Sequence, residues 1–205
     1  MICTIYENFK RKRNRANLND EAFSFLFDED LGKEYVVYDT ETTGLSVKND
    51  EILSIGAVKI RDNKILTSET FEVYVKNLKD ISTKSIEIHG IRPCDLEDAK
   101  DAEEAIKAFL HFIGSRTLIG YYLEFDVGMV NKYTKEMLGI KLPNKMLEVS
   151  EIYHDKEICR IPQGNIDLRF DTILKKYDVP NMGVHNAVND AIMTAMIYLK
   201  LTKGK

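Results

Sequence analysis

Apolar residues gather in four short runs of the chain that predict β-strands. Residues 35–38 (YVVY) are all aromatic or β-branched, which is typical of a strand buried on both faces. Residues 51–60 (EILSIGAVKI) form a second run, residues 70–75 (TFEVYV) alternate apolar with polar positions, and residues 117–121 (TLIGY) form a short fourth run. Three strands without intervening helices predict an antiparallel meander.

Elsewhere the apolar spacing is that of helices. Four segments show it: residues 101–113, 125–138, 171–177 and 186–201. Because a helix separates the fourth strand from the first three, we expect that strand to join the sheet in parallel orientation. The pattern predicts an α/β fold with a mixed central sheet, three leading antiparallel strands and flanking helices.

The first 33 residues differ from the rest of the chain. Residues 10–15 (KRKRNR) are a basic run, and residues 28–30 (DED) are acidic. Four apolar side chains between them are expected to anchor the segment on the main body: Phe23, Phe25, Leu26 and Phe27. We therefore divide the chain into an N-terminal helical arm, residues 1–33, and a main domain, residues 34–205. The basic run is either a solvated surface or a contact for phosphates or an acidic partner.

Composition narrows the class of protein. A chain of 205 residues suits one compact domain with a sizeable core, and 44% hydrophobic residues exclude a disordered chain. The net charge of −4 at pH 7 does not favour bulk binding of nucleic acid. Any such binding would have to depend on local basic patches and on metal ions.

The compartment is expected to be the cytoplasm. Cys3, Cys94 and Cys159 lack metal-binding spacing and are expected to be reduced thiols. No apolar run approaches the ~18 residues of a membrane span, and the first residues lack the apolar core of a secretion signal.

Four acidic residues stand out by their positions. Asp39 and Glu41 follow the first strand and can face one point, because residues i and i+2 of an extended segment project to the same side. Asp126 opens the helix after the fourth strand, and Asp190 lies near the start of the last helix. Clustered carboxylates repel one another unless cations neutralise them, and Mg²⁺ and Mn²⁺ prefer such ligands. Spacing alone does not bring the four together, since the chain has 33 acidic residues.

Three motifs resemble those of the DEDD exonucleases in their histidine form, the family that includes the proofreading epsilon subunit of bacterial DNA polymerase III. Residues 39–45 (DTETTGL) resemble the first motif, Phe125-Asp126 resembles the second, and residues 185–190 (HNAVND) resemble the third. Residues 88–91 (IHGI) resemble a short signature between the first two. The resemblance spans roughly residues 34–202. It implies a ribonuclease H-like exonuclease fold and makes residues 34–205 an exonuclease domain.

The resemblance also implies a role for each motif residue. Asp39 would bridge two divalent metal ions, Mg²⁺ or Mn²⁺, which together clamp a scissile phosphate. Glu41 and Asp190 would complete the site on the side of the attacking water, and Asp126 would hold the second ion. His185 would be the general base, a role that suits a side chain titrating near neutrality.

The residues that contact the substrate are less clearly indicated by the sequence than the metal ligands are. The resemblance implies that Thr42 and Thr43 contact the terminal nucleotide, although both also fit the turn at a strand end. Leu45 would pack against the terminal base or against the protein. His89 would approach the substrate or have a structural role.

The second motif departs from the family pattern. Tyr121 and Tyr122 stand where His-Asn is usual. Either tyrosine would stack on a base or be a buried aromatic side chain.

The expected function is that of a 3′→5′ exonuclease that hydrolyses single-stranded DNA by a two-metal-ion mechanism and releases nucleoside monophosphates, as in proofreading or repair. The alternatives are an exoribonuclease that trims RNA 3′ ends and a non-catalytic scaffold that binds nucleic acid or a polymerase. The expected partners are a single-stranded DNA or RNA 3′ end and a DNA polymerase subunit, with no membrane. No polymerase-docking tail is evident after the last helix, which favours a nuclease that acts alone.

Four lysines either flank the substrate channel or form a solvated face: Lys132, Lys135, Lys141 and Lys145.

Overall fold

A computed structural model describes residues 2–30, 32–77, 79–159, 165–183 and 185–203. Five strands form one sheet: β1 (Glu34–Thr42), β2 (Ile52–Arg61), β3 (Lys64–Tyr74), β4 (Thr117–Gly120) and β5 (Met146–Glu148). Their order across the sheet is β3-β2-β1-β4-β5. β1 and β3 are both antiparallel to β2, whereas β4 is parallel to β1 and β5 is parallel to β4. The mixed sheet with three leading antiparallel strands is therefore confirmed.

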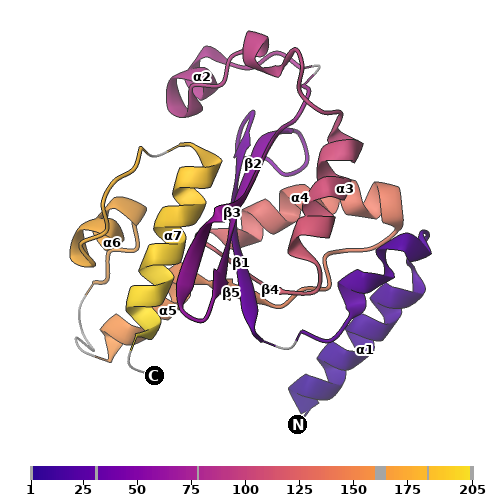
Figure 1. The fold of residues 1–205 in the computed structure, drawn as a ribbon, viewed down its shortest axis with the longest axis horizontal. Coiled ribbons are helices and arrows are strands. Elements are labelled where there is room, and N and C mark those ends of the chain that lie inside the picture. The colour runs from indigo at the N-terminus through magenta and orange to yellow at the C-terminus, as the bar shows by residue number, and fades with distance from the viewer. Residues whose placement is uncertain (1, 31, 78, 160–164, 184, 204–205) are drawn as a thin grey trace.

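Helices cover both faces of this sheet (Figure 1). The described helices, two of them 3₁₀ helices (η), are α1 (Ile2–Ala16), η1 (Glu21–Phe27), α2 (Thr83–His89), η2 (Pro93–Leu96), α3 (Ala102–Ile113), α4 (Leu123–Leu138), α5 (Val149–Ile158), α6 (Phe170–Lys176) and α7 (Ala187–Thr202). Val36 and Tyr38 of β1 are buried in one core with α3 and α4, while Val37 is buried in a second core with α5, α6 and α7. β1 is thus buried on both faces, as its apolar sequence predicts. Among the described helices, none combines the length and apolar character that crossing a bilayer requires.

Two strands are longer than the apolar runs that predict them. β1 continues from residue 38 to Thr42, and β3 begins at Lys64 rather than at residue 70. Asp62 and Asn63 join β2 to β3 with φ angles of 50° and 58°, the left-handed conformation of a tight hairpin turn. The first part of β3 is largely exposed at the sheet edge, so its polar sequence carried little sign of a strand.

Four observed elements are missing from the predicted order: α2, η2, β5 and α5. α2 has no buried residue, so it shows no apolar stripe. β5 has only three residues and cannot show a period. α5 follows β5 directly, and only Val149, Tyr153 and Glu157 are buried in it. The predicted helices agree with α3, α4, α6 and α7 to within two residues at each end.

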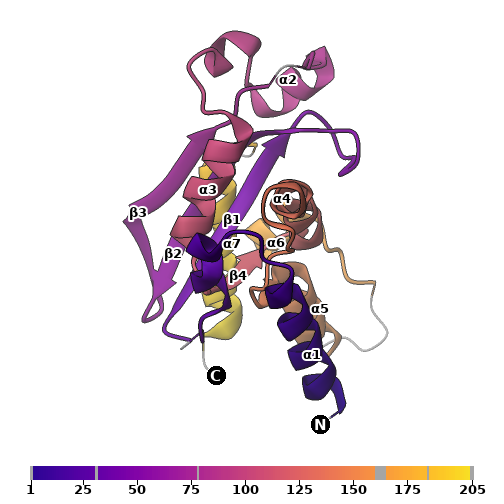
Figure 2. The same ribbon diagram turned by 90° about the vertical axis from the view of Figure 1, so that its right-hand side faces the viewer.

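The N-terminal arm packs on the main body. Phe23 and Leu26 of η1 are buried in the same core as α3 and α4. The backbone N–H of Asn19 donates a hydrogen bond to the carbonyl oxygen of Leu138, at the end of α4, over 3.0 Å. Figure 2 shows η1 below α3 and α1 below α4. The arm is therefore an extension of the core on the α3–α4 face.

Candidate active site

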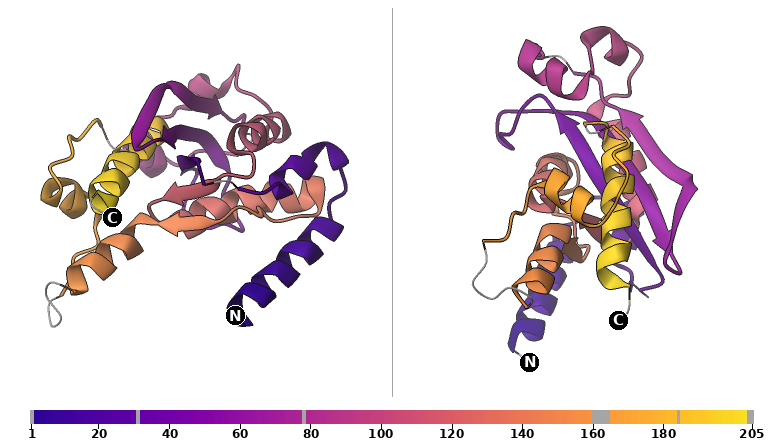
Figure 3. Two further views of the ribbon diagram at one scale, coloured as in Figure 1. Left: turned by 60° about the horizontal axis from the view of Figure 1, so that its bottom comes forward. Right: turned by 90° about the vertical axis from the view of Figure 1, so that its left-hand side faces the viewer.

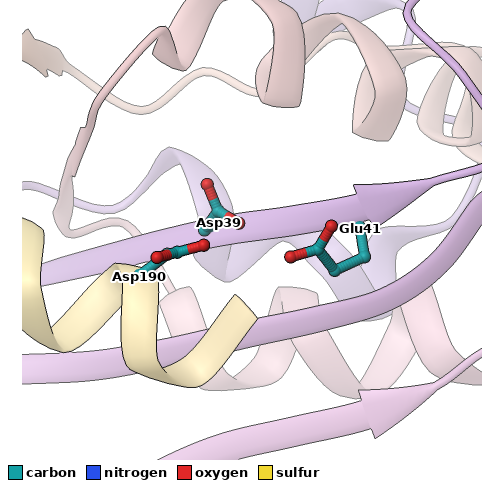
Figure 4. Close-up of side chains that lie close together, drawn as sticks. All are labelled: Asp39, Glu41 and Asp190. Carbon is teal, nitrogen blue, oxygen red and sulfur yellow. The ribbon is translucent and has the colours of Figure 1, made fainter. Parts of the chain in front are cut away.

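Three carboxylates meet where β1 ends and α7 begins. One oxygen of each of Asp39, Glu41 and Asp190 lies within 4.8 Å of the other two (Figure 4). Asp39 and Glu41 project from the same side of β1, as the i, i+2 spacing predicts. Glu41 is only 8% exposed, although β1 ends one residue later. The end of β1 therefore places two carboxylates in a largely buried position.

The position of α7 depends on a close approach to β2. Gly56 is paired with Asp39 across the β1–β2 ladder. A Cβ at Gly56 would lie 2.2 Å from the backbone carbon of Ala187 and the backbone nitrogen of Val188. Asn186 caps the helix by accepting a hydrogen bond from the backbone N–H of Asn189. A side-chain-free position beside Asp39 thus allows the first turn of α7 to bring Asp190 to the site.

The three carboxyl groups are shifted towards their protonated forms. Burial raises the pKa of Asp39 well above its usual value, and the nearby acids Asp126, Glu41 and Asp190 raise it further. Burial, with repulsion from Asp190 and Asp126, raises the pKa of Glu41 to about 7. Burial also raises the pKa of Asp190. Ionisation of all these groups together is therefore unfavourable unless a positive charge lies among them.

This set of ligands fits a hard divalent cation. Oδ1 of Asp190 is buried and has no hydrogen-bond partner in the described part of the chain. A buried carboxylate oxygen without a partner is costly, and binding of a metal ion would satisfy it. Carboxylate oxygens alone, without histidine or thiolate in the group of three, favour Mg²⁺ or Mn²⁺ over softer metals.

Asp126 lies in the same cleft but outside the group of three. It is 3% exposed, and its Oδ1 accepts hydrogen bonds from the backbone N–H of Thr40 at 3.0 Å and from the Thr40 hydroxyl at 2.5 Å. Burial raises its pKa despite these two bonds. Glu148 accepts from the backbone N–H of Leu123 and so secures the start of α4, which carries Asp126. Asp126 is thus held firmly against β1, beside Asp39.

His185 is joined to Asp190 through its backbone. Its N–H donates to Oδ2 of Asp190 over 2.8 Å, and its side chain lines the cleft. The residue has a φ of 64°, a left-handed conformation that is strained for a non-glycine residue. The hydrogen bond to Asp190 helps to hold this conformation, so the positions of the two residues depend on each other.

The cleft that contains these groups has a volume of about 560 Å³. Of the four expected substrate contacts, Thr42, Leu45 and His89 line it. Thr43 is not among the described residues that do. Its hydroxyl donates a hydrogen bond to Asp50 and accepts one from the backbone N–H of Glu51. Thr43 therefore has the other role that its sequence position allows, in the turn at the end of the strand.

The three residues in the cleft differ in their freedom to contact a ligand. The hydroxyl of Thr42 already donates to the carbonyl of Gly44. Leu45 is 85% exposed, so it does not pack in the core. Nδ1 of His89 accepts from the backbone N–H of Ile91, while its Nε2 is buried with no partner among the described residues. Of the three, Leu45 and His89 are therefore the freer to contact a ligand.

The two tyrosines of the second motif both line the cleft, in different ways. The Tyr121 hydroxyl donates to the carbonyl of Leu168, and its ring packs against Phe170. Tyr122 is 67% exposed and stacks on Phe125, with an angle of 15° between the rings. Tyr122 is therefore a surface aromatic at the mouth of the cleft and not a buried one.

One wall of the cleft was not indicated by any motif. It consists of Arg169, Phe170 and Asp171, at the start of α6. Arg169 forms an ion pair with Asp167. The helical period predicts α6 but not its neighbours, because more than forty residues separate it from the second motif.

The four lysines expected to flank a channel or to form a solvated face do not line this cleft. Lys132 forms an ion pair with Glu51 over 2.8 Å. The other three line a separate groove beside α1: Lys135, Lys141 and Lys145.

The chain matches the family model described as exonuclease over residues 36–198. A PolC-type DNA polymerase III of Caldanaerobacter subterraneus is 36% identical over 171 residues, which are 83% of this chain and 12% of that protein. The PolC-type polymerase of Bacillus subtilis is 32% identical over 92% of this chain and 13% of its own length. The chain thus spans about one eighth of these polymerases. The DNA polymerase III epsilon subunit of Aquifex aeolicus is 29% identical over 85% of this chain and 83% of its own length.

Solved structures show the same fold. Escherichia coli exonuclease I in complex with a dT13 oligonucleotide aligns with a TM-score of 0.70 at 16% identity, over 83% of this chain and 41% of that one. Exonuclease X in complex with 5′-overhanging duplex DNA aligns with a TM-score of 0.62 at 21% identity, over 82% and 90% of the two chains. The ribonuclease H-like exonuclease fold is confirmed. The family model matches most of the length of this chain, and the chain therefore belongs to the exonuclease family.

Proposed function

We propose that this protein is a 3′→5′ exonuclease that removes nucleoside monophosphates from the 3′ end of single-stranded DNA with the help of two divalent metal ions. The observation that carries the proposal is the group formed by Asp39, Glu41 and Asp190, in which one oxygen of each residue lies within 4.8 Å of the other two. Oδ1 of Asp190 is in addition buried without a hydrogen-bond partner in the described part of the chain. The names of the relatives, DNA polymerases and a polymerase epsilon subunit, favour DNA as the substrate.

Each residue of the site has a distinct task in this proposal. Asp39, Glu41 and Asp190 would hold one ion, and Asp126 with Asp39 would hold the other. Bound ions of this kind lower the pKa of a coordinated water and stabilise the charge that develops on the scissile phosphate. His185 would accept the proton of the attacking water, and the hydrogen bond from its backbone N–H to Asp190 keeps the residue beside the carboxylate group. Thr40 fixes Asp126 through two hydrogen bonds.

The apolar surfaces of the cleft suit the bases of the substrate. Leu45 and the stacked pair of Tyr122 and Phe125 are exposed or partly exposed within it. Stacking on such surfaces holds any base, so the enzyme would not select a sequence. We further propose a cytoplasmic location and a DNA polymerase as a partner, since the relatives are named as polymerases or polymerase subunits.

The test is an end-labelled oligonucleotide assay. Single-stranded DNA and RNA of the same sequence, labelled at the 5′ end, are incubated with Mg²⁺ or Mn²⁺, with or without chelator. We expect a ladder that shortens from the 3′ end, release of nucleoside monophosphates, loss of activity with chelator, and faster degradation of DNA. Shortening from the 5′ end, or binding without cleavage, would contradict the proposal. Faster degradation of RNA would replace DNA by RNA as the substrate.

Tyr122→Asn is expected to weaken binding of single-stranded DNA with little change in stability. A base stacked on an aromatic ring contributes about 1–3 kcal/mol, so the Kd should rise roughly 5- to 150-fold. Tyr122 has a φ of 59°, which asparagine adopts more easily, and this gain opposes the lost stacking on Phe125. Fluorescence anisotropy in chelator and thermal unfolding measure the two effects. Tyr122→Phe keeps the ring and should bind as the wild type does, and an unchanged Kd for Tyr122→Asn would exclude stacking.

A further inference from the structure

A second groove lies beside the N-terminal arm, with a volume of about 1100 Å³. Its lining residues come from α1 and the residue that follows it on one side, and from the end of α4 and the segment from α4 into β5 on the other. The left-hand view of Figure 3 shows how these elements are arranged. Six of its described lining residues are basic and none is acidic: Lys10, Arg11, Arg13, Lys135, Lys141 and Lys145. On a chain with a net charge of −4, this is a local concentration of positive charge.

Hydrogen bonds hold the two walls together. The guanidinium of Arg11 donates to the carbonyls of Pro143 at 2.7 Å and Asp28 at 3.0 Å. Asn14 forms two bonds with the backbone of Lys141, donating to its carbonyl at 2.7 Å and accepting from its N–H at 3.0 Å. The contacts of Arg11 with Pro143 and of Asn14 with Lys141 join residues more than 120 positions apart. They give the groove a fixed shape, as a preformed binding site requires.

Four other cations of the groove are exposed to solvent. The side chains of Arg13, Lys135, Lys141 and Lys145 are exposed, and none of them forms a salt bridge with a residue that the structure describes. Lys145 lies near enough to Asp30 to lower the pKa of that carboxyl, although Asp30 is not part of the lining. Like charges gathered in one groove repel one another, and a polyanion would relieve this repulsion.

The groove is connected to the catalytic cleft through α4. Asp126 lies in the first turn of this helix, whereas Lys135 and Gly139 line the groove at its other end. Nine residues of helix separate Asp126 from Lys135, which is about 14 Å at 1.5 Å per residue. A nucleic acid of more than a few nucleotides is long enough to contact both places.

We infer that this groove is a second binding site for nucleic acid, which holds the phosphodiester backbone of the substrate away from the 3′ end under degradation. Lysine and arginine bind phosphates without reading the bases, so the groove adds affinity that does not depend on sequence. Exposed Met146 and half-buried Pro143 in the lining offer apolar contact to sugars or bases. The inference rests on the proposed nuclease function in one respect only, namely that the nucleic acid bound in the groove is the strand under degradation.

The test compares a double charge reversal in the groove with a matched reversal elsewhere. Lys135→Glu with Lys141→Glu changes two lining residues, neither of which is in the catalytic cleft. Lys64→Glu with Lys175→Glu makes the same change of net charge at exposed positions outside both sites. Binding of a 30-nucleotide and a 4-nucleotide single-stranded DNA is measured in chelator at several salt concentrations. The rate of cleavage of the 4-nucleotide DNA is measured with Mn²⁺.

The groove variant is expected to bind the 30-nucleotide DNA at least about tenfold more weakly, with the slope of log K against log salt reduced by about 1.4, or ~0.7 for each lost phosphate contact. Its affinity for the 4-nucleotide DNA and its rate of cleavage should equal those of the wild type and the control. Equal affinity of the groove and control variants for the 30-nucleotide DNA would overturn the inference and favour an acidic protein as the occupant. Failure of the wild type to cleave would instead reject the nuclease proposal, while the binding comparison would still decide about the groove.

Discussion

Asp39→Asn is expected to abolish cleavage and, at the same time, to stabilise the metal-free protein. In the proposed mechanism Asp39 is the one carboxylate that would contribute to both metal sites. Metal ions contribute several kcal/mol of transition-state stabilisation, and each 1.36 kcal/mol is a factor of ten, so the rate should fall by about 10³-fold or more. The assay is the release of nucleoside monophosphates at saturating Mn²⁺.

The gain in stability follows from the direction of the pKa shift. The pKa of Asp39 is raised in the folded protein by burial and by Asp126, Glu41 and Asp190. A group whose folded pKa is raised contributes stability below its unfolded pKa, and this contribution is lost as the pH rises through the folded pKa. Asparagine removes the buried charge. In chelator, the melting temperature of the variant should therefore exceed that of the wild type at pH 8, and the difference should shrink as the pH falls towards about 3.9, the unfolded pKa of an aspartate.

Metal binding provides the second readout. Mn²⁺ should raise the melting temperature of the wild type, because it binds the folded state, and should have little effect on Asp39→Asn. Asp171→Asn is a matched control, since Asp171 is an acid of the same cleft that lies outside the group of three. A variant at Asp39 that kept more than a tenth of the metal-dependent activity would show that the ions are held elsewhere.

The parts of the site that were predictable are those encoded by short-range geometry. The i, i+2 spacing of Asp39 and Glu41 fixes their common direction once the strand is recognised, and the motif ending in Asp190 places this residue in the first turn of a helix. The apolar run at residues 35–38 has one explanation, a central strand, and β1 is central. That Asp39 and Glu41 lie close to Asp190 of α7 could be predicted only from the family resemblance, because no local rule relates residues about 150 positions apart.

The parts that could not be predicted depend on contacts between distant segments. Thr43 is held in a turn by Asp50 and Glu51, which the motif alone does not reveal. The basic run in the arm and the lysines of α4 and the following segment are separate in sequence, and only the packing of α1 unites them in one groove. The wall at residues 169–171 is likewise a product of tertiary packing.

Gly56→Ala is expected to reduce both the stability and the activity of the protein, although Gly56 carries no functional group. The added Cβ would lie 2.2 Å from backbone atoms of Ala187 and Val188, and backbone cannot rotate away as a side chain does. Overpacking a core costs about 1–3 kcal/mol when side chains absorb it, so a collision with backbone should reach at least the upper end of that range. Thermal or urea unfolding in chelator measures this loss.

The loss of activity should exceed what the loss of stability explains. To relieve the collision, the start of α7 must move away from β2, and Asp190 moves with it from Asp39, the partner of Gly56 in the ladder. A displacement of about 1 Å at a catalytic group can reduce the rate by about 10²-fold. At a temperature where the variant is fully folded, we therefore expect about a hundredfold slower cleavage and a higher Mn²⁺ concentration at half-maximal rate.

Gly128→Ala provides the matched comparison. It adds the same methyl group in α4, where the nearest atom is Cγ2 of Val47 at 3.1 Å, a side-chain atom that can shift. This variant should retain most of its stability and activity. If Gly56→Ala were folded and fully active with unchanged demand for Mn²⁺, the close approach of α7 to β2 would not be what positions Asp190.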